Sequence, residues 1–172
     1  MWSKTKKYLE SFVCETLKGR VEFFVTNYRK AHDEMGRAYI TVDKKEVFNM
    51  CSLKGEAATR TKEVELKRSK YIDRDVYNSN ESRMINEEAR QLVNKEGIFE
   101  QYEFFNAVEE YLNNPIKHSL NSTNMIIKIL SLIDRRVGKR TLENMKNIIE
   151  KEHELVKYFY KLRCEAEGIK IS

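Results

Sequence analysis

Cysteine is scarce in this sequence, and its positions exclude two classes of protein. The 172 residues include three cysteines, Cys14, Cys51 and Cys164, which are odd in number and far apart, with no CxxC pair. Cysteine-based metal sites and disulfide frameworks both use closely spaced cysteines. The spacing therefore predicts a reducing, cytoplasmic environment, and neither a metal site nor a disulfide framework.

Long apolar runs are also missing. The most apolar segment, Met125 to Ile133, is shorter than the about 20 apolar residues that a membrane span requires. Trp2 to Lys7 leads directly into an amphipathic pattern instead of a signal peptide, and there is no lipidation motif. We therefore expect a cytoplasmic protein with no membrane partner.

The sequence lacks the motifs of common catalytic and cofactor sites. Its six glycines are spread one per element boundary, so there is no glycine-rich phosphate loop, and there is no GxSxG motif. The histidines, His32, His118 and His153, lack HExxH spacing and a neighbouring cysteine. Isolated histidines are usually structural. The sequence predicts no catalytic residue, no cofactor and no metal, and an enzyme without a recognisable motif stays an alternative that we do not favour.

The sequence does contain one strongly apolar helix, around which the other segments are expected to pack. Its polar residues fall on one narrow stripe, formed by Asn124, Lys128, Ser131 and Arg135. A helix that is apolar around most of its circumference is buried on most sides. Ser122 or Thr123 is the expected N-cap.

The densest positive charge follows this helix, in the segment from Asp134 to Thr141, here called the basic corner. We expect Gly138 to adopt the left-handed conformation after the helix end and Thr141 to cap the next helix. Capping and helix-dipole effects explain most of these residue types, but a grip on a phosphate or an acidic partner would explain them too. The candidate binding residues are the four cations of the corner, Arg135, Arg136, Lys139 and Arg140.

The N-terminal portion, residues 1–54, combines a helix with a β-hairpin. Residues 3–16 have helical spacing, whereas residues 20–28 and 37–43 alternate and are rich in β-branched and aromatic types. The polar segment 30–36 is the expected hairpin loop, and the first helix is expected to cover the apolar face of the hairpin. Asp43 is then expected to cap a short helix over 44–53 that Gly55 closes.

The rest of the chain is expected to be helical. Residues 55–80 are the least hydrophobic and predict an exposed charged connection, either a helix or a mobile segment, and residues 81–172 predict a bundle of four or five helices. From Leu142 to Arg163 the pattern fits one helix or two that break near Glu152 and His153. The predicted fold class is α+β and mainly helical, in one compact domain overall.

Charge is unevenly distributed. The chain has a net charge of +5, yet residues 81–110 contain eight acids and three bases, a net of −5, so that the other residues carry +10. Acidic and basic elements could neutralise each other inside the protein, or a basic face could be left for nucleic acid. Lys4, Lys6 and Lys7 beside Trp2 and Tyr8 favour nucleic acid. Glu143, in the first turn after the corner, argues against reading the major groove.

Two parts of the chain resemble a family of small uncharacterised bacterial proteins. The segments MWSKTKKYLESFVCETLKGRVEF and GRAYITVDKKEVFNM are similar to the N-terminal half of that family. The segments NPIKHSLNSTNMIIKILSLIDRRVGKRTL and VKYFYKLR are similar to its C-terminal end, which has a DRRVGKR-type helical corner. The resemblance implies a bacterial cytosolic protein and carries no activity, cofactor or catalytic residue.

These observations predict a non-enzymatic module that binds a protein partner through the basic corner. Mixed charge and exposed aromatics favour a protein, and a homo-oligomer is one form that such binding could take. A nucleic acid bound on a basic face is the alternative, and an enzyme without a recognisable motif is the third.

Overall fold

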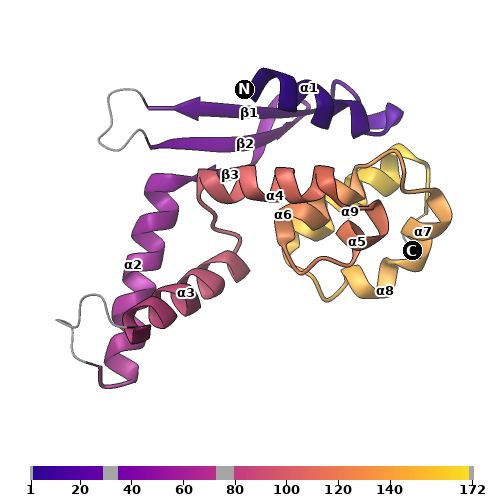
Figure 1. Cartoon of the computed structure of the whole chain (residues 1–172). Coiled ribbons are helices and arrows are strands. Elements are labelled where there is room, and N and C mark those ends of the chain that lie inside the picture. Colours follow the sequence, from indigo (N-terminus) through magenta and orange to yellow (C-terminus); the bar gives the residue numbers. More distant parts are fainter. Residues whose placement is uncertain (1, 29–34, 73–79, 171–172) are drawn as a thin grey trace.

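The computed structural model describes residues 2–28, 35–72 and 80–170, and it confirms the predicted α+β, mainly helical fold (Figure 1). A three-stranded sheet lies beside the helices α4 to α9, while α2 and α3 extend away from both. In chain order the elements are α1 (Trp2–Phe12), η1 (Glu15–Leu17), β1 (Val21–Asn27), β2 (Gly36–Val42), β3 (Lys45–Cys51), α2 (Ser52–Ser69), α3 (Asn80–Lys95), α4 (Gln101–Asn113), α5 (Ile116–Leu120), α6 (Met125–Leu132), α7 (Lys139–Asn144), α8 (Lys146–Ile149) and α9 (Glu154–Ala166).

The expected β-hairpin is present as β1 and β2, which pair antiparallel with Phe23 opposite Ile40. Its predicted loop lies mainly in residues 29–34, outside the described part of the chain. The predicted helix over 44–53 is wrong, because Asp43 and Lys44 adopt φ angles of 49° and 66° and form a tight turn into β3. Two central residues with positive φ suit a hairpin whose twist matches that of its strands. The open edge of β2 then pairs with β3, which buries Phe48.

Helices α2 and α3 pack against each other as a helical arm that projects from the sheet (Figure 1). Part of the expected connection over 55–80 is therefore the helix α2, and residues 73–79 lie outside the described ranges. Gly55, expected to close a helix, instead lies buried inside α2. A Cβ at Gly55 would overlap Cγ of Glu100 and lie 3.2 Å from the Glu100 nitrogen. The glycine thus lets α2 approach the linker before α4 closely.

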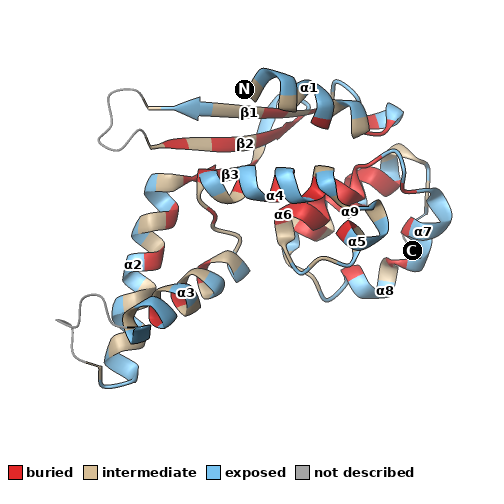
Figure 2. Cartoon of the chain, in the orientation of Figure 1, coloured by how far each residue is buried: buried red, intermediate tan, exposed pale blue. Residues whose placement is uncertain are grey.

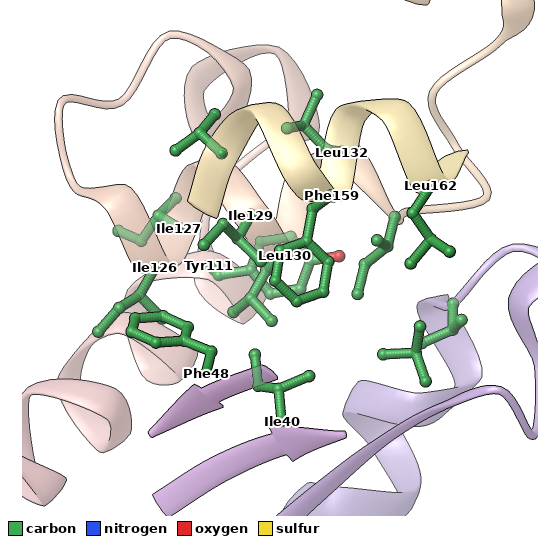
Figure 3. Close-up of a cluster of buried hydrophobic side chains, with 14 of the residues drawn as sticks. Ile40, Phe48, Tyr111, Ile126, Ile127, Ile129, Leu130, Leu132, Phe159 and Leu162 are labelled. Atoms are coloured by element: carbon green, nitrogen blue, oxygen red, sulfur yellow. The ribbon is translucent and has the colours of Figure 1, made fainter. Parts of the chain in front are cut away.

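The core is shared by the sheet and the helices α4, α6 and α9. Helix α4 packs on β2 and β3, α6 packs on α4, and α9 packs on α6. Buried residues are concentrated in α6 and α9, whereas the arm is mostly exposed or intermediate (Figure 2). Side chains of α6 and α9 face those of β2 and β3, among them Leu130, Phe159 and Ile40 (Figure 3).

Helix α6 is the buried rod that the sequence predicts, since every residue from Ile126 to Leu132 is buried. Its N-cap is Asn124, not Ser122 or Thr123, because the Asn124 side chain accepts hydrogen bonds from the backbone nitrogens of Ile126 at 2.9 Å and Ile127 at 3.3 Å. Lys128 is 9% exposed and forms an ion pair with Glu152. Lys128, within the predicted polar stripe, is therefore paired internally, whereas Arg135 at the end of the stripe is exposed.

The C-terminal segment breaks near Glu152 and His153, as one alternative predicted, but it also breaks at Met145, between α7 and α8, so that it forms three helices instead of one or two. His153 is the N-cap of α9, and its Nδ1 accepts a hydrogen bond of 3.1 Å from the Leu155 nitrogen. Tyr160 of α9 donates a hydrogen bond of 2.9 Å to the Leu142 carbonyl, and burial raises the pKa of this phenol to about 12. Helix α9 is thereby tied to α7.

Candidate binding corner

The basic corner lies where α6 ends, against the end of α1. The Cys14 nitrogen donates to the Ile133 carbonyl at 2.9 Å, and the Arg135 nitrogen donates to the Phe12 carbonyl at 2.7 Å. These two bonds form a short antiparallel bridge between Val13 and Asp134. The backbone that carries the first cations of the corner is thus fixed to a second element.

Asp134 is the polar centre of the corner. The residue is 0% exposed, and its carboxylate accepts hydrogen bonds from the Tyr111 hydroxyl, from the Arg136 backbone nitrogen at 2.7 Å and from the Arg136 guanidinium at 2.7 Å. The hydrogen bond to Asp134 raises the pKa of Arg136 above its ordinary value, whereas burial, together with that carboxylate, raises the pKa of the Tyr111 phenol. Such a buried acid is stable only because several donors compensate its lost hydration.

Arg163 supports the corner from α9. It is 3% exposed and donates to the Asp134 carbonyl at 3.0 Å and to the Val137 carbonyl at 2.9 Å. Its Nε lies 3.2 Å from a Glu167 carboxylate oxygen as an ion pair that lacks hydrogen-bond geometry. The planar guanidinium has several N–H donors in a fixed arrangement, so it can donate to both of these carbonyls, which lie between α6 and α7.

Sequence reasoning did not identify Arg163 or Tyr111 as parts of the corner. A signal for each exists in the helical spacing, because Arg163 continues the buried positions Val156, Phe159 and Tyr160 of α9, and Tyr111 continues the buried face of α4. A polar group at an otherwise buried helix position needs an internal partner. Which partner it finds depends on residues 23 to 29 positions away along the chain.

The four predicted cations lie around one turn, but only two of their side chains have partners among the described residues. The Arg136 side chain is 34% exposed, binds Asp134, and lies 4.2 Å from the ring centroid of Phe12. Lys139 donates at 2.7 Å to the Glu167 carbonyl at the end of α9, where the helix dipole favours a cation. Arg135 and Arg140 are exposed, and neither side chain has a hydrogen bond or ion pair among the described residues.

Two predicted details of the corner are wrong. Gly138 has φ −83°, so it is not left-handed, and it is the N-cap of α7. Thr141 is not the cap, because α7 already begins at Lys139. The physical reason is that Asp134 makes the turn itself by accepting the Arg136 nitrogen two residues later, which removes the need for a left-handed glycine.

Other candidate chemistry is limited within the described ranges. These residues contain no group of three or more His, Cys, Asp or Glu side chains that could hold a metal ion, and none of their helices is long and apolar enough to cross a membrane. All three cysteines are free and buried. His118 is exposed, and His32 lies outside the described residues.

Part of the charge asymmetry is satisfied internally. Acids of the 81–110 stretch pair with bases outside it through Lys62–Glu96, from α2, and Lys70–Glu88, from the residue after α2. The N-terminal lysines and aromatics are also partly engaged, since Lys6 lies 4.4 Å from the Phe24 ring centroid and Trp2 packs on Phe104. The two ion pairs support the interpretation in which acidic and basic elements neutralise each other.

Comparison with known proteins matches the chain to a protein family. A family model described as the SF0329 protein family matches residues 1–164. Searches of curated proteins and of solved structures found no match. The family match therefore brings no ligand, reaction or partner from a relative, and the corner itself has to indicate the function.

Proposed function

We propose that this chain, which belongs to the SF0329 protein family, is a non-enzymatic module that binds an acidic protein partner through the basic corner. The observation that carries the proposal is that two of the four cations have internal partners and the other two have none among the described residues. Arg136 and Lys139 hold the turn, whereas Arg135 and Arg140 extend from it without a partner among the described residues. The favoured contact residues are therefore Arg135 and Arg140, with Arg136 and Lys139 positioning them.

The rigidity of the corner supports this proposal. The Arg135 nitrogen is hydrogen-bonded to the Phe12 carbonyl of α1, and the Asp134 carboxylate closes the turn. Arg163 of α9 donates hydrogen bonds to carbonyls of the corner. Arginine side chains on a fixed backbone lose less freedom on binding than those on a mobile loop. Their guanidinium groups can then form paired hydrogen bonds with the carboxylates of a partner.

A protein fits the corner better than a nucleic acid does. Tight nucleic-acid binding rests on several simultaneous phosphate contacts, whereas the corner offers two unpaired cations within the described residues, with the exposed acid Glu143 on the adjoining helix. The buried free cysteines support a reducing cytoplasm. Together with the resemblance of the sequence to bacterial proteins, they lead us to place the protein in a bacterial cytoplasm.

A salt titration with defined probes tests the proposed function. The probes are a labelled peptide of acidic residues and a single-stranded DNA of equal charge, measured by fluorescence anisotropy. Arg135→Glu/Arg140→Glu should weaken peptide binding about tenfold at low salt, because two attractive contacts become repulsive. The wild-type protein should bind the peptide more tightly than the DNA.

A matched control is available on the arm. Lys54 and Arg68 are exposed on α2 and have no ion pair among the described residues. Lys54→Glu/Arg68→Glu changes the net charge by the same amount as the corner variant, so it should leave peptide binding unchanged if the contact is local. Equal losses in both variants, or tighter binding to DNA than to the peptide, would overturn the proposal.

A further inference from the structure

We infer that the partner also places apolar side chains on an aromatic strip beside the corner, so that it presents an apolar segment followed by carboxylates. The strip consists of Trp2, Tyr8 and Phe12 of α1 and Phe105 of α4. This inference rests on the proposed function and names the chemistry of the partner. It is carried by the exposure of the strip, by its order along the two helices and by its contact with the corner.

The strip follows the seam between α1 and α4. The Trp2 ring lies 5.6 Å from Phe104 and 5.8 Å from Phe105 near the start of both helices, and Phe12 lies 6.2 Å from Tyr111 near their ends. The two helices therefore run in the same direction, as Figure 1 also shows. The aromatic side chains thus extend from the start of α1 towards the corner.

Two rings of the strip are open to solvent although they are held in place. Tyr8 is 55% exposed and Phe105 is 38% exposed. Tyr8 packs edge-on against Phe12 at 5.1 Å, and Phe105 packs edge-on against Trp2. Aromatic side chains that are both exposed and ordered are typical of the residues that contribute most to protein interfaces.

The strip and the corner are in direct contact. The Arg136 guanidinium lies 4.2 Å from the Phe12 ring centroid, and the Arg135 nitrogen donates to the Phe12 carbonyl. A ligand that covers Tyr8 and Phe12 would therefore lie beside the Arg136 guanidinium and the backbone of Arg135. An apolar surface that ends in unpaired cations is complementary to an apolar segment that ends in acids.

The charge on α4 beside the strip favours a protein segment as the occupant over nucleic acid. Glu109 is exposed on α4, four residues after Phe105, and would repel phosphates that follow the strip. Lys6 is directed at Phe24 on β1, whereas Lys4 and Lys7 are exposed on α1 and supply the positive charge that a nucleic acid would need. Carboxylates of the partner would accordingly lie at the corner, and its apolar side chains would lie over α1 and α4.

Peptide-display selection tests this inference while the partner is unidentified. A random peptide library is selected on the full wild-type chain, and the consensus peptide is then synthesised and measured by fluorescence anisotropy. The expected consensus combines a large apolar or aromatic residue with two or more acids. Tyr8→Ser/Phe105→Ser should weaken its binding about tenfold, because both exposed rings are lost, whereas Tyr8→Phe should retain it.

The control for this experiment removes two exposed apolar side chains elsewhere, each at least as exposed as Phe105. Met84 and Tyr158 are 71% and 40% exposed and lie on α3 and α9. Met84→Ser/Tyr158→Ser should leave the affinity unchanged, and circular-dichroism melting should show that all variants fold like the wild type. Because the substituted side chains are exposed, loss of folding is not expected.

The outcomes separate the inference from the proposed function. Acidic peptides without an apolar consensus, weakened by Arg135→Glu/Arg140→Glu but not by the strip variant, would overturn the inference and leave the proposed function standing. Binding that depends on the strip but not on the corner would overturn the proposed function. Failure to enrich any peptide, competition by single-stranded DNA at equal affinity, or a concentration-dependent dimer lost in the strip variant would each overturn the partner chemistry inferred here.

Discussion

Replacing Asp134 with alanine is expected to lower the free energy of unfolding by about 3–5 kcal/mol, because removing one partner of a buried charge pair leaves the others uncompensated. The Tyr111 hydroxyl, the Arg136 nitrogen and the Arg136 guanidinium would all lose their acceptor in a site that is 0% exposed at its centre. Urea unfolding monitored by circular dichroism measures the effect. A domain with about 5–15 kcal/mol of total stability would be severely weakened.

Tyr111→Phe and Asp134→Ala together form the control for this prediction. If the phenol and the carboxylate interact as the structure shows, the double variant should be more stable than the sum of the two single losses implies. Additive losses would mean that Tyr111 does not depend on Asp134. A loss of less than about 1 kcal/mol in Asp134→Ala would contradict the role of this residue as the polar centre of the corner.

The second large effect is expected in α6, where Leu130→Ala should cost about 2–5 kcal/mol through lost burial and the cavity left behind. Leu130 is 1% exposed and lies among side chains of α6 and α9 that face the sheet (Figure 3). Because α4 and α9 both pack on α6 and its side chains also face the sheet, there is little free volume into which the neighbours can relax. Urea unfolding again provides the measurement.

Lys128→Met is the matched substitution on the same helix. Lys128 is 9% exposed and pairs with Glu152, which is 27% exposed in its side chain. Replacing a mostly buried ion pair member with an apolar residue of similar length offsets lost attraction with regained burial, so the change should be much smaller than that of Leu130→Ala. Equal costs at the two positions would show that α6 is not the apolar rod of the core.

The fold could be predicted where one periodicity dominated over the whole length of an element. The narrow polar stripe fits only a helix, and the alternation in residues 20–28 and 37–43 fits only strands. The structure has the helix α6 and the strands β1 and β2 at these positions. Residues 44–53 instead have apolar positions that also fit helical spacing, so their pattern alone predicts a helix. The strand β3 forms because β2 offers it an edge to pair with, which is tertiary information.

The basic corner also depends on tertiary contacts that the sequence does not reveal. Its four cations are visible in the sequence, but which of them are available depends on Asp134, Glu167 and the end of α1, which converge only in the folded chain. Arg135 and Arg136 are neighbours of identical type, yet Arg136 binds a buried acid and Arg135 has no side-chain partner in the described part of the molecule. Composition alone cannot separate two such residues.

Arginine-selective labelling of the native protein tests this division most directly. Under limited phenylglyoxal, with each site located by mass spectrometry, Arg135 and Arg140 should react before Arg136 and Arg163, because their guanidinium groups are exposed and unpaired among the described residues. Arg136 and Arg163 should be protected by Asp134 and by the carbonyls of the corner. Reaction of Arg136 as fast as Arg135, or protection of Arg140, would contradict the account of a turn held by two cations that presents two others to a partner.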